Sequence, residues 1–173
     1  MDFGGEVFPY LLENQYELYG FVKDYYWLDC GNPQTYLWAN WDLLRKYAWP
    51  ITPNGKEYDG IFVMGIINSG ERVKIEKPSC FGEYVQLGEN VKVKELTSIG
   101  NNVKIGNDTK IERSVIWDNV EIGEGCEITE TIICNDCKIG NNVILDRAII
   151  APHCKVSNEK ELIDKTLNLG EEV

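Results

Sequence analysis

The chain has 173 residues, of which 43% are hydrophobic, so it is long enough to bury one core and carry an appendage. Its formal net charge of −11 repels phosphate backbones and anionic lipid, so we expect neither nucleic acid nor a membrane as a partner. There is no secretory leader and no apolar run of transmembrane length, which predicts a cytoplasmic protein with reduced cysteines.

The N-terminal segment, residues 1–48, is rich in aromatic side chains. In it, Asp29 precedes a Gly-Asn-Pro turn, and Asn32 followed by Pro33 predicts the start of a helix over residues 33–47. This helix is apolar around much of its circumference, which predicts burial on more than one side. From spacing alone, Asp29 is interpreted as a solvated turn carboxylate.

A domain boundary is predicted in the stretch WPITPNGKEYDG, residues 49–60. It holds two Pro, two Gly and an Asn-Gly pair, which mark turns. We therefore expect a linker and a strand over residues 49–70, between the N-terminal segment and a repeat region at 71–157.

The repeat region carries a large side chain every six residues from residue 75, with single steps of five at 111–116, 128–133 and 145–150. This hexapeptide pattern predicts a parallel β-helix with three short strands per turn and about five turns. Ile111, Ile128 and Leu145 should then stack in one column. Glycine often follows the large residue, as expected where the backbone bends tightly or takes a positive φ.

A second inward position is predicted four residues after each large side chain, where most residues are small or β-branched. Val115, Ile132 and Ile149 occupy such positions, and so do three cysteines.

The cysteines of the repeat include a tempting motif, Cys134-Asn-Asp-Cys137, which looks like a redox or zinc half-site. The repeat places Cys137 inward and Cys134 at a bend, so their thiols should point apart. We interpret Cys126, Cys137 and Cys154 as core residues, because a free cysteine packs as a small hydrophobe.

The single histidine, His153, lies at a predicted corner of the coil. Hexapeptide acyltransferases resemble this coil and use a histidine as general base, which makes His153 a candidate acyltransferase base. The repeat runs unbroken from Ile75 to Val156 and leaves no protruding loop to build a cleft. This favours an ordinary surface histidine.

The tail, residues 158–173, is predicted to be a short helix. Asn158 and Glu161 form a plausible capping pair before Leu162 and Ile163. Such a helix would cover the open strand edges at the end of the coil.

Three stretches of the chain together resemble a known family: DFGGEVFPYLLEN (2–14), YGFVKDYYWLDCGNPQTYLWANWDLL (19–44) and ERSVIWDNVEIGEGCEI (112–128). They are similar to the C-terminal half of sugar-1-phosphate nucleotidyltransferases, the NDP-sugar pyrophosphorylases, in the branch that contains mannose-1-phosphate guanylyltransferases and glucose-1-phosphate nucleotidyltransferases. The resemblance implies a mainly β fold: a left-handed parallel β-helix after a small α/β remnant of the nucleotidyltransferase domain.

The resemblance also implies a chemistry and a metal. In that family, an oxygen of the sugar phosphate attacks the α-phosphorus of a nucleoside triphosphate, and pyrophosphate leaves. The Asp at the position of Asp29 is the second of two carboxylates that hold the catalytic Mg²⁺.

Several elements of the family's nucleotide-binding half are not found in this sequence, namely the Gly-rich loop with its Arg, the first metal carboxylate and the sugar-site motifs. Glu-Lys-Pro occurs at 76–78, but it lies in the first step of the repeat. We therefore expect the C-terminal portion of such an enzyme, with no complete catalytic site and with a coil that serves oligomerisation or regulation.

Two other functions stay open, a free-standing regulatory subunit and, less favoured, an acyltransferase. For the parent enzyme, the resemblance implies Mg²⁺ as cofactor and a nucleoside triphosphate and a sugar 1-phosphate as ligands. We also expect a homo-oligomer. Without the nucleotide-binding half, apolar surface should be uncovered around Phe3, Phe8, Trp27, Trp38 and Trp41.

Overall fold

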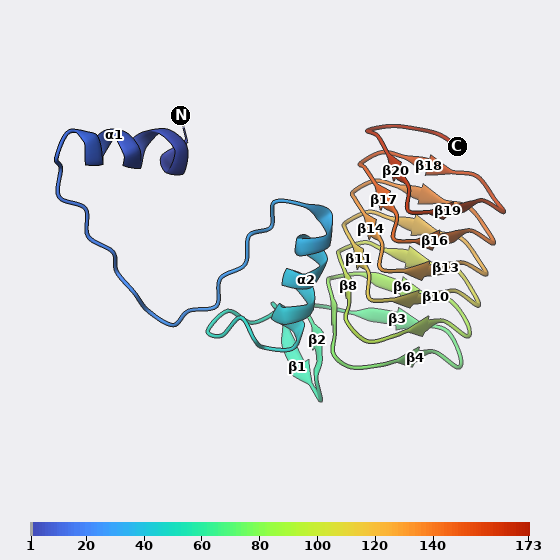
Figure 1. The fold of residues 1–173 in the computed structure, drawn as a ribbon. Helices are drawn as coiled ribbons and strands as arrows, with labels where there is room; N and C mark the ends of the chain where they lie inside the picture. Colours follow the sequence, from blue (N-terminus) through green and yellow to red (C-terminus); the bar gives the residue numbers. More distant parts are fainter. Residues whose placement is uncertain (1) are drawn as a thin grey trace.

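The computed structural model describes residues 2–173 and consists of an N-terminal part and a coil (Figure 1). A π-helix, η1 (Phe3–Val7), continues directly into α1 (Phe8–Glu13). Residues 16–31 have no regular secondary structure, and α2 (Pro33–Leu44) follows them. Within residues 2–173, no helix has both the length and the apolar character needed to cross a membrane.

The coil is built from three parallel sheets that form its three faces. Sheet A contains β1 (Lys56–Tyr58), β2 (Ile61–Val63), β5 (Ser79–Phe81), β8 (Thr97–Ile99), β11 (Val115–Ile116), β14 (Ile132–Ile133), β17 (Ile149–Ile150) and β20 (Thr166–Leu167). Sheet B contains β3 (Ile67–Ser69), β6 (Val85–Leu87), β9 (Lys104–Ile105), β12 (Glu121–Ile122), β15 (Lys138–Ile139) and β18 (Lys155–Val156). Sheet C contains β4 (Lys74–Ile75), β7 (Lys92–Val93), β10 (Lys110–Glu112), β13 (Glu127–Thr129), β16 (Ile144–Asp146) and β19 (Glu161–Ile163).

Each turn of the coil contributes one strand to each sheet, so neighbouring strands in a sheet come from successive turns. Only the pairing of β1 with β2 is antiparallel. Ile111 lies in register with Ile128, and Ile128 with Leu145, which confirms the predicted column. The fold is the predicted left-handed β-helix, and its buried aliphatic side chains form one continuous core along the axis.

The glycines at the strand ends are needed for close approach between turns and not for a positive φ. A Cβ on Gly106 would lie 2.5 Å from the carbonyl carbon of Gly123, and one on Gly82 would lie 2.6 Å from Oδ1 of Asn101. The positive φ values fall two residues further on, mostly at Asn, Asp, Arg, Glu or His, for example at Asn102. Of the two roles predicted for these glycines, a tight bend or a positive φ, the positive φ is therefore not found.

Asparagine and aspartate side chains link successive turns at these corners. Asn101 Oδ1 accepts the backbone N–H of Glu83 at 2.8 Å, and Asp118 Oδ1 accepts that of Asn101 at 2.7 Å. Asn135 Oδ1 accepts the N–H of Asp118 at 2.9 Å. These bonds satisfy corner N–H groups that the parallel ladders leave without a strand partner.

The coil is longer than predicted, with about six turns instead of five. It begins at β2, before the predicted repeat region. The first turn was missed in the sequence because Ser69 occupies a position of the six-residue repeat where a large residue was expected. It also continues beyond residue 157, and the predicted helix at 158–173 is wrong. Leu162 lies in register with Leu145, so the residues interpreted as a cap form β19 and β20 instead.

The steps of five change which side chains point inward on sheet A. Ser114, Thr131 and Ala148 are fully buried inside the coil, whereas Val115 is in register with the outward Ser98. The prediction that Val115, Ile132 and Ile149 point into the coil is therefore wrong. One residue fewer in the turn shifts the alternation by one place, so these three side chains face outward.

Candidate functional site

Helix α2 begins where the sequence predicted, because Asn32 and Thr35 form a reciprocal cap. Asn32 Oδ1 accepts the Thr35 backbone N–H at 3.0 Å, and Thr35 Oγ1 accepts the Asn32 N–H at 3.3 Å. Pro33 occupies the first turn, where its missing N–H costs nothing. The helix ends at Leu44, three residues before the predicted end.

The outer face of sheet A carries this helix (Figure 1). Leu37 packs against the outward side chains of Val115 and Ile132. Near the other end of α2, Leu44 packs with Phe62 in a second buried cluster. The helix is thus fixed to the coil by its apolar side chains at both ends, which sets the position of the chain that precedes it.

An aromatic pair adds a directional contact between α2 and the coil. Trp117 Nε1 donates a hydrogen bond to the hydroxyl oxygen of Tyr36 at 3.1 Å, and the two rings meet edge to face with centroids 6.4 Å apart. The surface that binds α2, formed by Val115, Ile132 and Trp117, was not predicted from the sequence. The available signal was two adjacent apolar residues at 115–116 and 132–133, since a strand that is apolar on both faces is buried on both faces.

Asp29 lies three residues before the cap of α2, with an exposed carboxylate. The segment is tied to the helix at one point, where the Tyr26 hydroxyl donates to Asp42 Oδ2 at 3.1 Å. Gly31 passes close to the carboxylate: a Cβ there would lie 3.3 Å from Asp29 Oδ1. The Asp-Cys-Gly-Asn-Pro turn thus presents Asp29 outward beside the coil.

The fit of Mg²⁺ to this position can be judged from the donor set. Among residues 2–173, no three His, Cys, Asp or Glu side chains converge on one point. Protein-bound Mg²⁺ generally uses one or two carboxylates together with substrate phosphates. Asp29 by itself therefore does not form a Mg²⁺ site in this chain.

The repeat cysteines are core residues, as predicted. Cys126, Cys137 and Cys154 are fully buried, and the thiol of each donates to a backbone carbonyl fourteen residues further on, in the adjoining turn. Burial raises the pKa of Cys137 to about 11. Cys134 is half-buried beside the cluster under α2, so the two cysteines of the apparent motif belong to different environments.

His153 lies at a corner of the last complete turns, with a positive φ of 63°. Its side chain is 62% exposed, and Nδ1 lies 3.6 Å from Oδ2 of Asp136. Asp136 in turn accepts from the side chain of Asn119, so the histidine ends a row of polar corner residues. This exposed position suits a surface residue.

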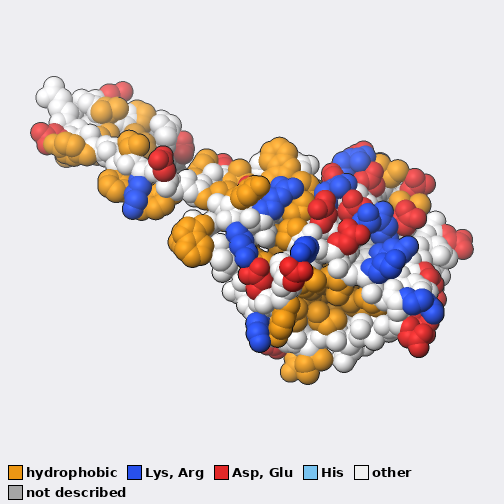
Figure 2. Space-filling model, turned by 90° about the horizontal axis from the view of Figure 1, so that it is seen from below, with side chains coloured by type: hydrophobic (Ala, Val, Ile, Leu, Met, Phe, Trp, Pro, Cys, Tyr) orange, Lys and Arg blue, Asp and Glu red, His pale blue; other side chains and the backbone are white. Residues whose placement is uncertain are grey.

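The N-terminal arm, residues 2–31, carries exposed apolar side chains away from the coil (Figure 2). Phe3 is 68% exposed and Trp27 is 81% exposed, and Phe8 is also exposed. On α2, Trp38 is exposed, whereas Trp41 is half-buried against the coil. Burial of α2 on more than one side is therefore not found within the described residues, and most of the predicted uncovered surface is present.

The fold defines a class, the left-handed β-helix proteins. Residues 59–162 match the family described as the EIF2B subunit epsilon LbH domain, where LbH denotes a left-handed β-helix. The match spans more than half of the chain, and the chain belongs to this family. No match was found among curated proteins.

Proposed function

We propose that this chain is the C-terminal portion of a nucleotidyltransferase that makes NDP-sugars from a sugar 1-phosphate and a nucleoside triphosphate. In this proposal the coil serves assembly and regulation, in a cytoplasmic homo-oligomer. The observation that carries it is the placement of Asp29, which is held outward by a capped helix that is itself docked on the coil. By resemblance, this carboxylate is the second ligand of a Mg²⁺ whose other partners come from elsewhere.

The N-terminal arm supports the same proposal, because its exposed aromatic side chains could be covered by another protein unit. Each buried aromatic side chain hides about 150–250 Å². Phe3, Phe8 and Trp27 are all exposed, so together they leave a few hundred Å² of aromatic surface open to solvent. A nucleotide-binding α/β unit that covered the arm would also bring phosphates and a first carboxylate to Asp29.

A division of labour follows for the chemistry. The nucleotide-binding unit would position the triphosphate, and a sugar phosphate oxygen would attack the α-phosphorus in line with the leaving pyrophosphate. Mg²⁺, when bound, would offset the charge that develops on the phosphate oxygens. The part of this chain is to place one carboxylate and to hold it at a fixed distance from the coil.

The test is pyrophosphate release from a nucleoside triphosphate, a hexose 1-phosphate and Mg²⁺. We expect none from the chain alone, and release when a nucleotide-binding unit of a nucleotidyltransferase is added. Asp29→Ala should abolish the release, and Asp24→Ala, a matched exposed carboxylate in the same segment, should leave it intact. Turnover by the chain alone, or equal activity of Asp29→Ala in the mixture, would refute the proposal.

A regulatory subunit is the second candidate, and one finding favours it: the matching family is described as a domain of a subunit. In that case the chain should alter the activity of a catalytic partner, and Asp29→Ala should alter it equally. No observation favours an acyltransferase, and acetyl transfer that disappears in His153→Ala would be needed to revive that function.

A further inference from the structure

The outer face of sheet C has an unusual distribution of charge. One outward residue per strand lies in register through the whole sheet, and we call this row the C-face column: Lys74, Lys92, Lys110, Glu127, Ile144 and Glu161. Three lysines occupy successive turns at one end, and the acidic residues occupy the other end. Neighbouring strands are about 4.8 Å apart, so the lysines repel one another.

On sheet B, the lysines of the corresponding row have acidic partners within the chain. In its corresponding row, Lys104 and Lys138 lie on either side of Glu121, with N–O distances of 3.2 and 3.6 Å. Lys155 follows Lys138 in this row and pairs with Glu172, so the charges do not strictly alternate, but each of these lysines has a partner within the molecule. On sheet C, by contrast, Lys74, Lys92, Glu127 and Glu161 form no ion pair with any residue between 2 and 173.

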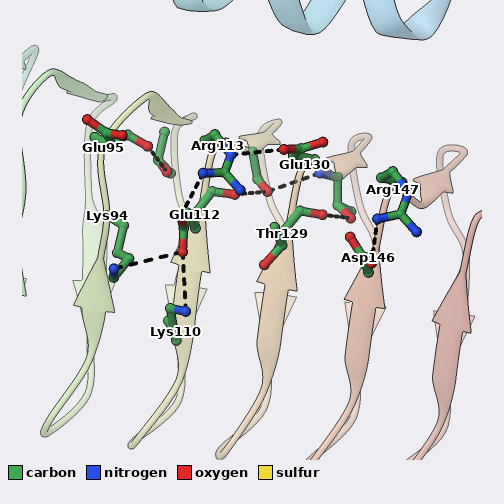
Figure 3. Close-up of polar contacts among 12 residues, drawn as sticks. Lys94, Glu95, Lys110, Glu112, Arg113, Thr129, Glu130, Asp146 and Arg147 are labelled. Carbon is green, nitrogen blue, oxygen red and sulfur yellow. Dashed lines mark hydrogen bonds and ion pairs between the residues drawn. The ribbon is translucent and has the colours of Figure 1, made fainter.

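The neighbouring outward row of sheet C is already paired within the chain (Figure 3). Lys94 and Lys110 both point toward Glu112, with N–O distances of 3.9 and 3.2 Å. Asp146 lies 2.7 Å from Arg147. In the C-face column, Lys110 is thus paired with Glu112, whereas Lys74, Lys92, Glu127 and Glu161 have no ion-pair partner and lie in the same row as the 40% exposed side chain of Ile144.

We propose that a second copy of this chain packs antiparallel on the C-face column, about a two-fold axis that runs along the strands. With this symmetry, the first strand of sheet C in one copy lies opposite the last strand in the other copy, the second opposite the second-last, and the third opposite the fourth. Lys74 of one copy then faces Glu161 of the other, and Lys110 faces Glu127. Lys92 lies opposite Ile144, where its aliphatic stem can cover the apolar side chain. The surface is self-complementary, as an isologous interface requires.

The alternative two-fold axis, along the coil, gives a parallel dimer that fits this face less well. It would place Lys110 of one copy opposite Glu112 of the other, but also Lys92 opposite Lys94, whereas the antiparallel arrangement opposes no like charges along the C-face column. The charge order thus selects the antiparallel arrangement. This inference rests on the assembly role proposed above for the coil, and it does not depend on nucleotidyl transfer.

The size of the face sets the expected affinity. Six strands spaced by about 4.8 Å give a height of about 24 Å, and three-residue strands give a width of about 10 Å. With its corners, such a face buries less than the roughly 1,200 Å² that separates stable from transient interfaces. We therefore expect a weak dimer, which is best measured by sedimentation at about 100 µM, in the range of transient complexes.

Charge reversal provides the main test. Lys74→Glu with Lys110→Glu makes the column acidic, and Glu127→Lys with Glu161→Lys makes it basic. Each double variant should be monomeric at concentrations at which the wild type is dimeric, and an equimolar mixture should restore the dimer. Lys104→Glu with Lys138→Glu changes the net charge on sheet B by the same amount as the acidic variant, and it should leave the dimer intact.

A cross-link identifies the orientation. In a Cys30→Ser background, which removes the exposed native thiol, Lys92→Cys with Ile144→Cys should give a covalent dimer with a bis-maleimide that spans about 10 Å, the usual spacing of packed sheets. Lys104→Cys with Lys155→Cys has the same spacing in turns on sheet B and should give none.

Three results would overturn the proposal: a wild type that stays monomeric at 100 µM, reversal variants that dimerise like the wild type, or a mixture that stays monomeric. A monomeric wild type that binds poly-glutamate through Lys74 and Lys110 would assign the face to another protein. If the chain with an added nucleotide-binding unit releases pyrophosphate but the coil does not dimerise, only the dimer proposal is refuted. If the coil dimerises but no pyrophosphate is released, only the catalytic proposal is refuted.

Discussion

At the scale of single residues, the coil leaves no space for a β-carbon where one turn crosses the next. The Cβ of Gly106→Ala would lie 2.5 and 2.6 Å from the backbone carbonyl of Gly123, which cannot move without disturbing the ladder. We expect a loss of about 1–3 kcal/mol in the free energy of unfolding, measured by urea denaturation. Gly20→Ala, which has no neighbouring atom within 4 Å, is the control and should change stability by less than about 0.5 kcal/mol. Equal stability of the two variants would contradict this account.

The cysteines give a second residue-scale prediction. A thiol reacts as its thiolate, and burial both hides Cys137 and raises its pKa to about 11. At pH 8 a maleimide should label Cys30 rapidly, whereas Cys126, Cys137 and Cys154 should be labelled only after unfolding in urea. Mass spectrometry of labelled peptides identifies the sites. Fast labelling of Cys137 in the folded chain would show that the coil interior is open to solvent.

At the scale of elements, α2 is a separate unit held on sheet A by few side chains. Leu37→Asp places a charge against Val115 and Ile132, and we expect the helix to detach while the coil stays folded. A loss of about 2–3 kcal/mol would make amide exchange in residues 33–44 roughly 100-fold faster, with the coil amides unchanged. Gln34→Asp, at an exposed position of the same helix, is the control. Unchanged exchange in Leu37→Asp would mean that other contacts hold the helix.

At the scale of the whole molecule, the coil is quasi-one-dimensional, because each turn contacts only the turns beside it. Deletion of residues 132–148 removes one seventeen-residue turn and joins Thr131 to Ile149, which already pairs with Ile132 in register. The shortened chain should fold and melt cooperatively, with Ile149 in the place of Ile132 under α2. Deletion of 131–148, one residue more, leaves only four places from Ile128 to Ile150, where the coil uses steps of five or six, and should not fold. Circular dichroism and thermal unfolding compare the two deletions, and similar melting curves would contradict the register argument.

The sequence by itself determined the features that depend on local spacing. The six-residue step predicted the β-helix and the Ile111, Ile128 and Leu145 column, because a period of large inward residues constrains a strand whatever surrounds it. The start of α2 at Pro33 was readable for the same reason, since a cap is formed within four residues. The inward cysteines followed from the repeat as well.

Only the tertiary structure decided the features that depend on residues seventeen or more places apart. The length of each turn decides which of two adjacent apolar residues faces outward on sheet A. The sequence of a single strand therefore could not predict that Val115 and Ile132 form the surface that binds α2. The tail is a strand because Leu145 offers Leu162 a ladder edge, which competes successfully with a local helix cap. The segregated charges of the C-face column and the isolation of Asp29 likewise appear only when the turns are stacked, since electrostatic neighbours are set by distance in space and not along the chain.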